Sequence, residues 1–197
     1  MQTILAMYMT LMSVILAGVS NMVFCKYPIF ESLNRPMDAG RHWSKDQKRL
    51  FGANKTWKGF FGMIAFGTLY QILWGLLSKA LPVLEHYNYL YQHQPNTVAF
   101  NALIGFGLGF AYVLFELPNS FIKRRLNIQP GKQATNHLRW LFIIIDQIDS
   151  LIGCTLVLAA FIPMTLGQYT AYVLLGGISH LAINQLLYQL NLRRNPY

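Results

Sequence analysis

The stretch that decides the fold is residues 120–149, SFIKRRLNIQPGKQATNHLRWLFIIIDQID. Three consecutive cations, Lys123, Arg124 and Arg125, lie near its start, and two carboxylates, Asp146 and Asp149, lie at its end. Apolar runs long enough to cross a bilayer flank it on both sides. Cations that can hold phosphate and carboxylates that can hold a divalent metal, placed at the edge of a membrane, indicate phosphoryl or nucleotidyl chemistry on a lipid.

The composition of the chain is that of a membrane protein. Of its 197 residues, 54% are hydrophobic and 12% are charged, whereas soluble domains average roughly 25% charged residues. The apolar residues gather in blocks of about 20, the length that crosses a hydrocarbon core. We therefore expect an all-α fold, in which residues 1–197 form a single integral membrane domain. It would be a bundle of about five transmembrane helices, with cytoplasmic loops forming the site. The five blocks are residues 4–24, 59–81, 97–117, 140–164 and 169–190.

The cations set the orientation of this bundle. All but one of the 16 Lys and Arg residues lie after the first block, after the third block or in the C-terminal tail. Cytoplasmic segments carry an excess of Lys and Arg, so these three segments should face the cytoplasm and the N-terminus should lie outside. A net charge of +9 would indicate nucleic-acid binding in a soluble protein. Here topology and phosphate binding account for it, and we expect no nucleic-acid partner.

Asp146 and Asp149 are three residues apart, which places both carboxylates on one face of a helix. Mg²⁺ is typically bound by one or two carboxylates together with substrate phosphates, so the pair predicts a magnesium site. The alternative is a pair at a helix start among the lipid headgroups. An ionised Asp at membrane depth is costly and usually functional, which favours the metal.

The cationic cluster has two interpretations that the residues alone do not separate. Lys123, Arg124 and Arg125 can bind phosphate, or they can be the cations expected at the cytoplasmic end of any span. Ser120, just before them, can cap the start of a helix. Glu116, at the end of the third block, can pair with a loop cation, reach a metal or be a terminal charge.

Two further regions carry polar groups suited to a substrate. Loop one (residues 25–58) carries PMDAG at residues 36–40 and runs into FGANKTWKG at residues 51–59. Asn, Lys and Thr just before a helix can meet a phosphate, although P-loop spacing is absent and a solvated basic loop is the alternative. On the fifth block, His180, Asn184 and Tyr188 recur every four residues and predict a polar stripe that faces the site or a neighbouring helix.

The order of these motifs resembles a known family. The pattern SFIKRRxxxxPG followed by DQxD is similar to the signature of CTP-dependent lipid-phosphate cytidylyltransferases. The archaeal CDP-archaeol synthase branch is the most similar in size and layout, and CDP-diacylglycerol synthases are more distant relatives. PMDAG, GANKTWKG and HLAINQLLY (residues 180–188) resemble the first cytoplasmic loop and the last span of that branch. The resemblance thus extends over nearly the whole chain.

The resemblance implies transfer of CMP from CTP to a lipid phosphate of the bilayer, giving a CDP-lipid and pyrophosphate, with Mg²⁺ as cofactor. The catalytic residues it implies are Lys123, Arg124, Asp146 and Asp149, of which the two aspartates hold the metal. The size of the bundle and its glycine-rich third block also suggest a homodimer. The residues expected to contact the substrates are Asp38, Asn54, Lys55, Ser120, Arg125, His180 and Asn184.

This chain departs from the branch at three places. Ala53 and Lys132 stand where the branch usually has an acidic residue, and the link from Pro130 to Asp146 is longer. Phosphatidic acid and an ether-linked isoprenoid phosphate present the same headgroup, so either is a candidate substrate. Two other classes stay open, a non-catalytic protein that binds anionic lipids and a small lipid transporter. The paired aspartates argue against the first, because an anion-binding face gains nothing from added negative charge.

Overall fold

The structure is a computed structural model that describes residues 2–135 and 137–190. In these ranges every element is helical, and five helices are long and apolar enough to cross a membrane. The prediction of an all-α bundle of about five transmembrane helices is confirmed. The elements are α1 (Gln2–Lys26), the 3-10 helix η1 (Glu31–Leu33), α2 (Trp57–Ala80), α3 (Pro82–Tyr87), α4 (Tyr89–His93), α5 (Val98–Arg125), α6 (Arg139–Phe161) and α7 (Leu166–Gln189).

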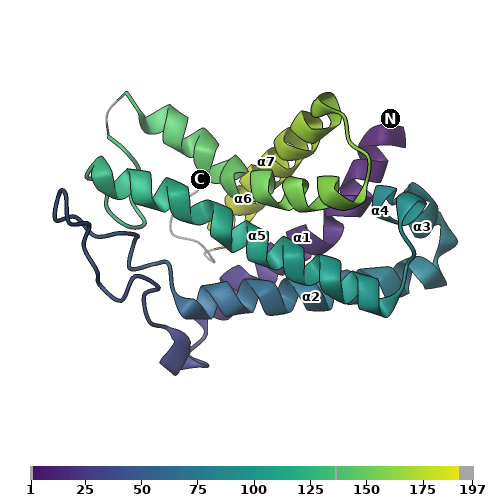
Figure 1. The fold of residues 1–197 in the computed structure, drawn as a ribbon, viewed down its shortest axis with the longest axis horizontal. Coiled ribbons are helices and arrows are strands. Elements are labelled where there is room, and N and C mark those ends of the chain that lie inside the picture. The colour runs from purple at the N-terminus through teal and green to yellow at the C-terminus, as the bar shows by residue number, and fades with distance from the viewer. Residues whose placement is uncertain (1, 136, 191–197) are drawn as a thin grey trace.

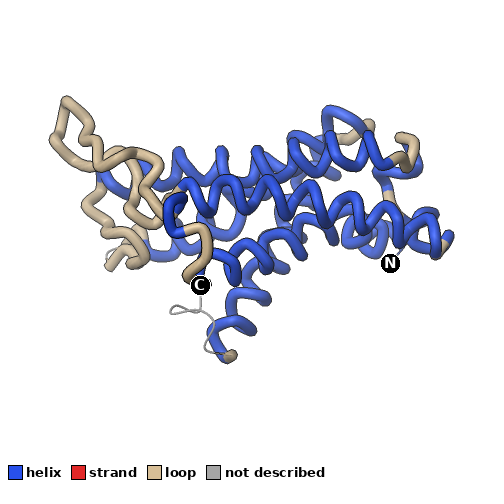
Figure 2. Tube along the Cα trace, turned by 90° about the horizontal axis from the view of Figure 1, so that it is seen from below, coloured by secondary structure: helices blue, strands red, loops and turns tan. Residues whose placement is uncertain are grey.

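Four of the long helices form a group centred on α5, and α7 packs on α6 and α1. Figure 1 shows α2 and α5 side by side along the bundle, with α6 packed against α5 as well. The loops that join α1 to α2 and α5 to α6 lie at one end of the bundle, on the left in Figure 1, and the short helices α3 and α4 lie at the other. In Figure 2 the loops are again concentrated at that first end. The two cation-rich segments are therefore neighbours in space.

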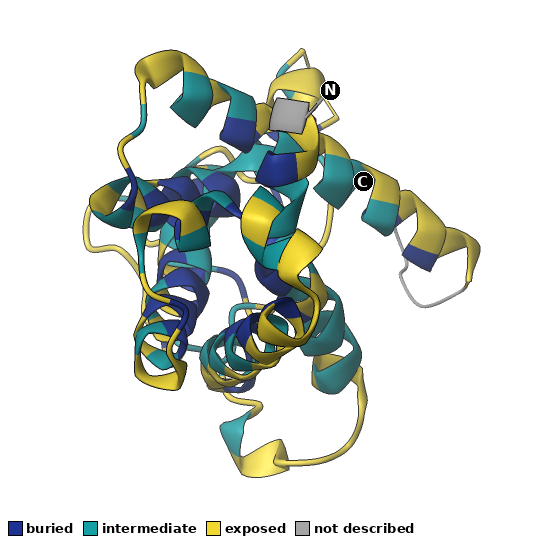
Figure 3. Cartoon of the chain, turned by 90° about the vertical axis from the view of Figure 1, so that its right-hand side faces the viewer, coloured by how far each residue is buried: buried dark blue, intermediate teal, exposed yellow. Residues whose placement is uncertain are grey.

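The bundle is apolar outside and partly polar inside, as expected for a protein surrounded by lipid. Leu73 on α2 and Phe106 on α5 are exposed, whereas Gln71 and Asn101 on the same helices are buried. The Gln71 amide donates a hydrogen bond of 3.3 Å to Asn101, which satisfies two polar groups that have no access to water. Figure 3 shows the same pattern along the helices, with exposed residues on their outer faces.

The largest difference from the predicted spans is at the end of the third. The predicted span ends at residue 117, but α5 continues through Pro118 to Arg125. A proline inside a helix removes one hydrogen bond and strains the turn before it, whereas cations in the last turn are favoured by the helix dipole. Ser120 therefore lies inside α5, which excludes the alternative that it caps a helix start. The other four spans begin and end within three residues of the predicted positions.

The start of α7 shows why one of these small differences arises. α7 begins at Leu166, three residues before the predicted start, because Thr165 and Gln168 form a capping box. The Thr165 hydroxyl accepts from the Gln168 N–H at 3.2 Å, and the Gln168 side chain accepts from the Thr165 N–H at 2.8 Å. Two N–H groups that would otherwise be unpaired at the helix end are thereby satisfied.

Two glycines allow α2 and α5 to approach closely, and this contact can be tested. A Cβ added at Gly105 would lie 2.6 Å from the carbonyl oxygen of Gly67. Because backbone atoms cannot swing aside, Gly105→Ala should destabilise the fold by about 1–3 kcal/mol, the usual cost of overpacking. We expect the melting temperature of the detergent-solubilised protein to fall by several degrees. Gly107→Ala is the matched control on the same helix, since its Cβ would meet the Val157 side chain at 3.3 Å. Equal losses for the two variants would contradict this account.

Candidate active site

A polar cavity of about 460 Å³ lies at the end of the bundle that carries the long loops. Its volume is in the range of ligand sites, about 300–1,000 Å³. Helices α1, α2, α5, α6 and α7 and both cation-rich loops contribute to its walls. Charged groups of both signs are therefore enclosed together at the edge of the membrane-spanning region. The charged residues that line it are Lys26, Lys55, Glu116, Lys123, Arg124, Lys132, Asp146 and Asp149.

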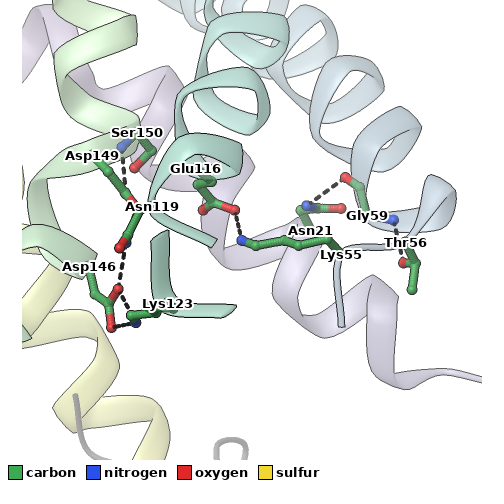
Figure 4. A network of polar contacts seen from close by, with 10 residues as sticks. All are labelled: Asn21, Lys55, Thr56, Gly59, Glu116, Asn119, Lys123, Asp146, Asp149 and Ser150. Carbon is green, nitrogen blue, oxygen red and sulfur yellow. Dashed lines mark hydrogen bonds and ion pairs between the residues drawn. The ribbon is translucent and has the colours of Figure 1, made fainter. Parts of the chain in front are cut away.

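The two aspartates of α6 face the last turns of α5 (Figure 4). Asn119 lies between them, and its Nδ2 donates to Asp146 Oδ1 and to Asp149 Oδ2, each at 2.7 Å. One turn further along α5, the Lys123 ammonium contacts both oxygens of Asp146 at 2.5 Å. The remaining oxygen of Asp149 accepts from the N–H of Ser150 at 2.6 Å. The carboxylates are thus held together by an amide and a cation.

A second pair of opposite charges lies on the other side of the cavity. Lys55, from the loop that precedes α2, forms an ion pair with Glu116 on α5 (Figure 4). Thr56 follows Lys55 directly and caps α2, because its hydroxyl accepts from the Gly59 N–H at 3.2 Å. This cap fixes the backbone position of Lys55 just before the helix. Burial disfavours the charged form of Lys55, but the Glu116 carboxylate outweighs it, and the pKa of Lys55 is raised above its ordinary value. The interpretation that Glu116 pairs with a loop cation is confirmed.

Several other predicted residues also line the cavity. Asn54 and Ser120 reach it from loop one and α5, and His180 reaches it from α7. Arg124 is 9% exposed, and its Nε and Nη1 have no hydrogen-bond partner among the described residues. Buried polar groups are normally paired, so these two unpaired nitrogens of Arg124 suit an anionic ligand.

The oxygen atoms of Asp146, Asp149 and their neighbour Asn119 are suited to binding a magnesium ion. Besides the two carboxylates, the buried Oδ1 of Asn119 has no hydrogen-bond partner among the described residues. A half-turn of that amide would present a third oxygen beside the carboxylates, and Mg²⁺ prefers oxygen ligands. The described part of the chain holds no cluster of three or more His, Cys, Asp and Glu residues. Further ligands would therefore be phosphates of a substrate or water, the arrangement usual for magnesium.

Asp38, predicted to contact substrate, lies outside the cavity lining. It is buried inside loop one, where it accepts from Arg49 at 2.7 and 2.8 Å and from the backbone N–H groups of Gly40 and Phe51 at 2.9 and 3.1 Å. Burial alone would raise the pKa of Asp38, but the bonds to Arg49 and the backbone outweigh it, and the pKa lies below the ordinary value. Both oxygens are thus engaged in holding the loop together.

Arg125 and Asn184 also lie outside the lining. Arg125 forms an ion pair of 2.9 Å with Asp46 and so joins α5 to loop one. Asn184 is fully buried and donates to the Gln147 side chain at 2.9 Å. Gln147 lies between the two aspartates in sequence but on another face of α6, so this bond fixes α6 against α7. Tyr188 is 44% exposed, so the predicted polar stripe of α7 does not face one side throughout. The tail cations, Arg193 and Arg194, lie outside the described residues.

Asn119 is the residue of the site that the sequence did not predict. Glu116, Asn119 and Lys123 recur at spacings of three and four, which places them on one face of a helix. The pattern is visible only if the helix continues through Pro118, where proline normally argues for a stop. Lys132 also lines the cavity, so the residue noted as a departure from the family adds a cation to the site.

The fold and the cavity together indicate the class of protein: an integral membrane protein that encloses charged groups suited to phosphorylated substrates at one end of its bundle. The family then follows from comparison with known proteins. The chain belongs to the CDP-archaeol synthase family of CTP-dependent lipid cytidylyltransferases, because the CarS-like family model, described as CDP-archaeol synthase, matches residues 2–197. The resemblance drawn from the sequence motifs is confirmed.

Similar proteins from archaea carry the name CDP-archaeol synthase. The one from Archaeoglobus fulgidus is 32% identical over 166 residues, which cover 82% of this chain and 84% of that protein. The one from Thermococcus gammatolerans is 29% identical over 170 residues, 86% of each chain. The match with Pyrococcus furiosus, 33% identical over 117 residues, covers 59% of this chain and 61% of the relative. A solved structure, described as an intramembrane enzyme for archaeal membrane lipids biosynthesis, shares the fold with a TM-score of 0.61 and 22% identity, covering 90% of this chain and 91% of that one.

Proposed function

We propose that this chain transfers CMP from CTP to archaetidic acid, forming CDP-archaeol and pyrophosphate. A phosphate oxygen of the lipid forms a bond to the α-phosphorus of CTP, the bond from that phosphorus to the oxygen bridging the α- and β-phosphates breaks, and pyrophosphate leaves. The observation that carries the proposal is the single cavity in which Lys55, Lys123, Asp146 and Asp149 converge. The identity of the lipid rests on the relatives that carry the name CDP-archaeol synthase.

This reaction requires no general base from the protein. The second pKa of a phosphomonoester is about 6, so the attacking oxygen is already largely ionised at neutral pH. The work of the chain is then to align two highly charged substrates and to neutralise their charge. Lys55, Lys123, Arg124 and Lys132 line the cavity from three directions and would hold the triphosphate and the lipid phosphate.

Asp146, Asp149 and the amide oxygen of Asn119 are the groups that would hold Mg²⁺. When bound, the ion would neutralise phosphate charge and make the α-phosphorus more electrophilic. Lys123 balances the charge of Asp146 in the structure described here. From the same helix face it can turn toward a phosphate instead, so a single lysine would serve both the empty and the loaded site.

The remaining predicted residues fall into two groups: those that would contact substrate, and those that would hold loop one and α6 in place. Asn54 and His180, which line the cavity, would contact substrate. Asp38, Arg125 and Asn184 would act indirectly, by holding loop one and α6 in the positions from which their neighbours reach the cavity.

The active site would face the cytoplasm, with the N-terminus outside. The cavity lies at the end of the bundle that carries the two cation-rich loops, and cytoplasmic segments carry the excess of Lys and Arg. CTP is also a cytoplasmic nucleotide. A homodimer stays a prediction.

Turnover by purified protein tests the proposal. The protein in detergent, with CTP and Mg²⁺, would be given archaetidic acid, phosphatidic acid or unphosphorylated archaeol, and pyrophosphate and CDP-lipid would be measured together. We expect equal amounts of both products with archaetidic acid and neither with archaeol. Binding of archaetidic acid without pyrophosphate release would instead indicate a non-catalytic lipid-binding protein. Lipid movement in liposomes that needs no CTP would indicate a transporter.

A further inference from the structure

Residues 27–33, the first part of loop one, expose a cluster of apolar side chains. The exposed fractions are 60% for Tyr27, 48% for Ile29 and 64% for Phe30. These residues follow the last turn of α1 and lie outside the membrane-spanning helices. None of them is among the residues that line the polar cavity. Exposed apolar clusters mark contacts with another protein or with a membrane, so this segment has a partner that the bundle itself does not supply.

The segment is held in one shape by the helices beside it. The carbonyl of Tyr27 accepts a hydrogen bond of 2.6 Å from the ammonium of Lys58, a buried lysine in the first turn of α2. The ring of Phe30 lies 6.0 Å from the ring of Phe24 on α1. Phe30 also adopts φ 53 and ψ 43, a left-handed conformation that is rare for a bulky residue and persists only where the surroundings fix it. A defined turn therefore presents the exposed side chains.

The position of the segment indicates what surrounds it. Helices α2 and α5 run horizontally in Figure 1, and η1 lies to the side of the start of α2, below it in that view. The later part of loop one instead extends beyond the end of the bundle, on the left. The segment is thus displaced sideways, in the direction in which lipid surrounds the bundle, at the level where a span begins.

The exposed aromatic surface of α2 begins at the same level. Trp57 and Phe61, in the first turns of α2, are 38% and 48% exposed, and their rings are stacked with centroids 5.6 Å apart. Trp and Tyr are enriched where the hydrocarbon core meets the headgroups. The surface of the segment is therefore continuous with the lipid-facing surface of α2, which favours the bilayer as its partner.

We propose that residues 27–33 insert into the boundary between the lipid headgroups and the hydrocarbon core, on the side of the membrane that carries loop one. The apolar side chains of the segment enter this boundary, and the exposed charges of Glu31 and Arg35 stay among the headgroups. The segment thereby anchors the start of loop one to the bilayer. This anchoring does not depend on the reaction that the site catalyses.

The anchored segment is connected to the polar cavity through the backbone. The Trp57 N–H donates to the carbonyl of Arg35 at 3.0 Å, and the Met37 N–H donates to the carbonyl of Lys55 at 2.8 Å. Lys55 in turn forms the ion pair with Glu116 in the cavity. The membrane anchor therefore also steadies the stretch of backbone from which Lys55 reaches the site.

A spin label tests whether the segment lies in the membrane boundary. Cys25 is exposed and would be replaced by Ser, whereas the buried Cys154 can stay. Phe30→Cys and, as its control, Lys45→Cys at an exposed site in the later part of loop one would carry a nitroxide. Both would be studied in liposomes of phosphatidylcholine and phosphatidylglycerol. Oxygen concentrates in lipid and a neutral nickel chelate stays in water, so the ratio of relaxation by oxygen to relaxation by nickel should be several-fold higher at residue 30.

Two outcomes of this measurement would overturn the proposal. Equal ratios at residues 30 and 45 would place the segment in water. Weak relaxation by both reagents at residue 30, with broadening of the spectrum by a second nitroxide, would show that a second copy of the chain covers it. Ile29→Cys repeats the test if the melting temperature shows that Phe30→Cys unfolds.

Hydrogen exchange in the same liposomes tests the connection to the cavity. Phe30→Ser weakens the anchor, so the Met37 N–H should exchange several-fold faster than in the unsubstituted protein. Lys45→Ser, at an exposed position of the same loop, should leave that rate unchanged. An unchanged rate in Phe30→Ser would show that the segment does not steady the backbone beside Lys55.

Discussion

Asp149→Asn should reduce CDP-lipid formation by roughly a hundredfold to a thousandfold, the usual loss when a group that stabilises developing charge is removed. The substitution keeps the volume of the side chain and can still accept from the Ser150 N–H, so the fold should be preserved. It removes one of the two negative charges that face Asn119. Activity should be measured over a range of Mg²⁺ concentrations at saturating CTP. The concentration needed for half-maximal activity should rise.

Asp46→Asn is the control for this experiment. Asp46 is also a carboxylate in an ion pair, with Arg125 at 2.9 Å, but it lies in loop one and is not among the residues that line the cavity. Its replacement should leave the Mg²⁺ dependence unchanged. If Asp149→Asn has nearly full activity and an unchanged Mg²⁺ requirement, the metal role of this residue is wrong. If both variants lose activity equally, the effect is one of folding.

The sequence predicted the fold well because the signals for a membrane bundle are local. A span is recognised from about 20 apolar residues in a row, and orientation is predicted from the cations between spans. The metal-binding hypothesis for Asp146 and Asp149 was equally local, since a spacing of three places both on one helix face. Each of these inferences needs only the residues of one segment and knowledge of the helix repeat.

Contacts between segments were harder to predict. Nothing in loop one signals that Asp38 pairs with Arg49, because the loop has no regular repeat that brings the two together. Asn119 was missed because Pro118 beside it suggested that the helix had ended. The sequence therefore predicted which groups carry charge, and the structure was needed to show which of them meet.

Lys123→Ala should change activity and metal binding in opposite directions. Loss of a charge-assisted contact to phosphate should lower kcat/KM by roughly tenfold to a hundredfold, in line with about 1.5–3 kcal/mol for a hydrogen bond to a charged group. Lys123 also balances the charge of Asp146, which it contacts at 2.5 Å. In the variant, the two carboxylates that face Asn119 have one positive charge fewer near them to balance their own charge. Mg²⁺ should then bind more tightly and raise the melting temperature more than in the unsubstituted protein.

Two companion variants make this prediction specific. Lys123→Arg keeps the positive charge and should restore much of the activity and the ordinary response to Mg²⁺. Lys79→Ala removes an exposed lysine from the last turn of α2, at the opposite end of that helix from the residues that line the cavity. It should change neither the activity nor Mg²⁺ binding. A cation that only sets the orientation of the protein in the membrane should not affect Mg²⁺ binding. If Lys123→Ala therefore leaves both KM values and the Mg²⁺-dependent melting shift unchanged, Lys123 only marks the cytoplasmic end of α5, and phosphate binding must be assigned to Arg124 and Lys55.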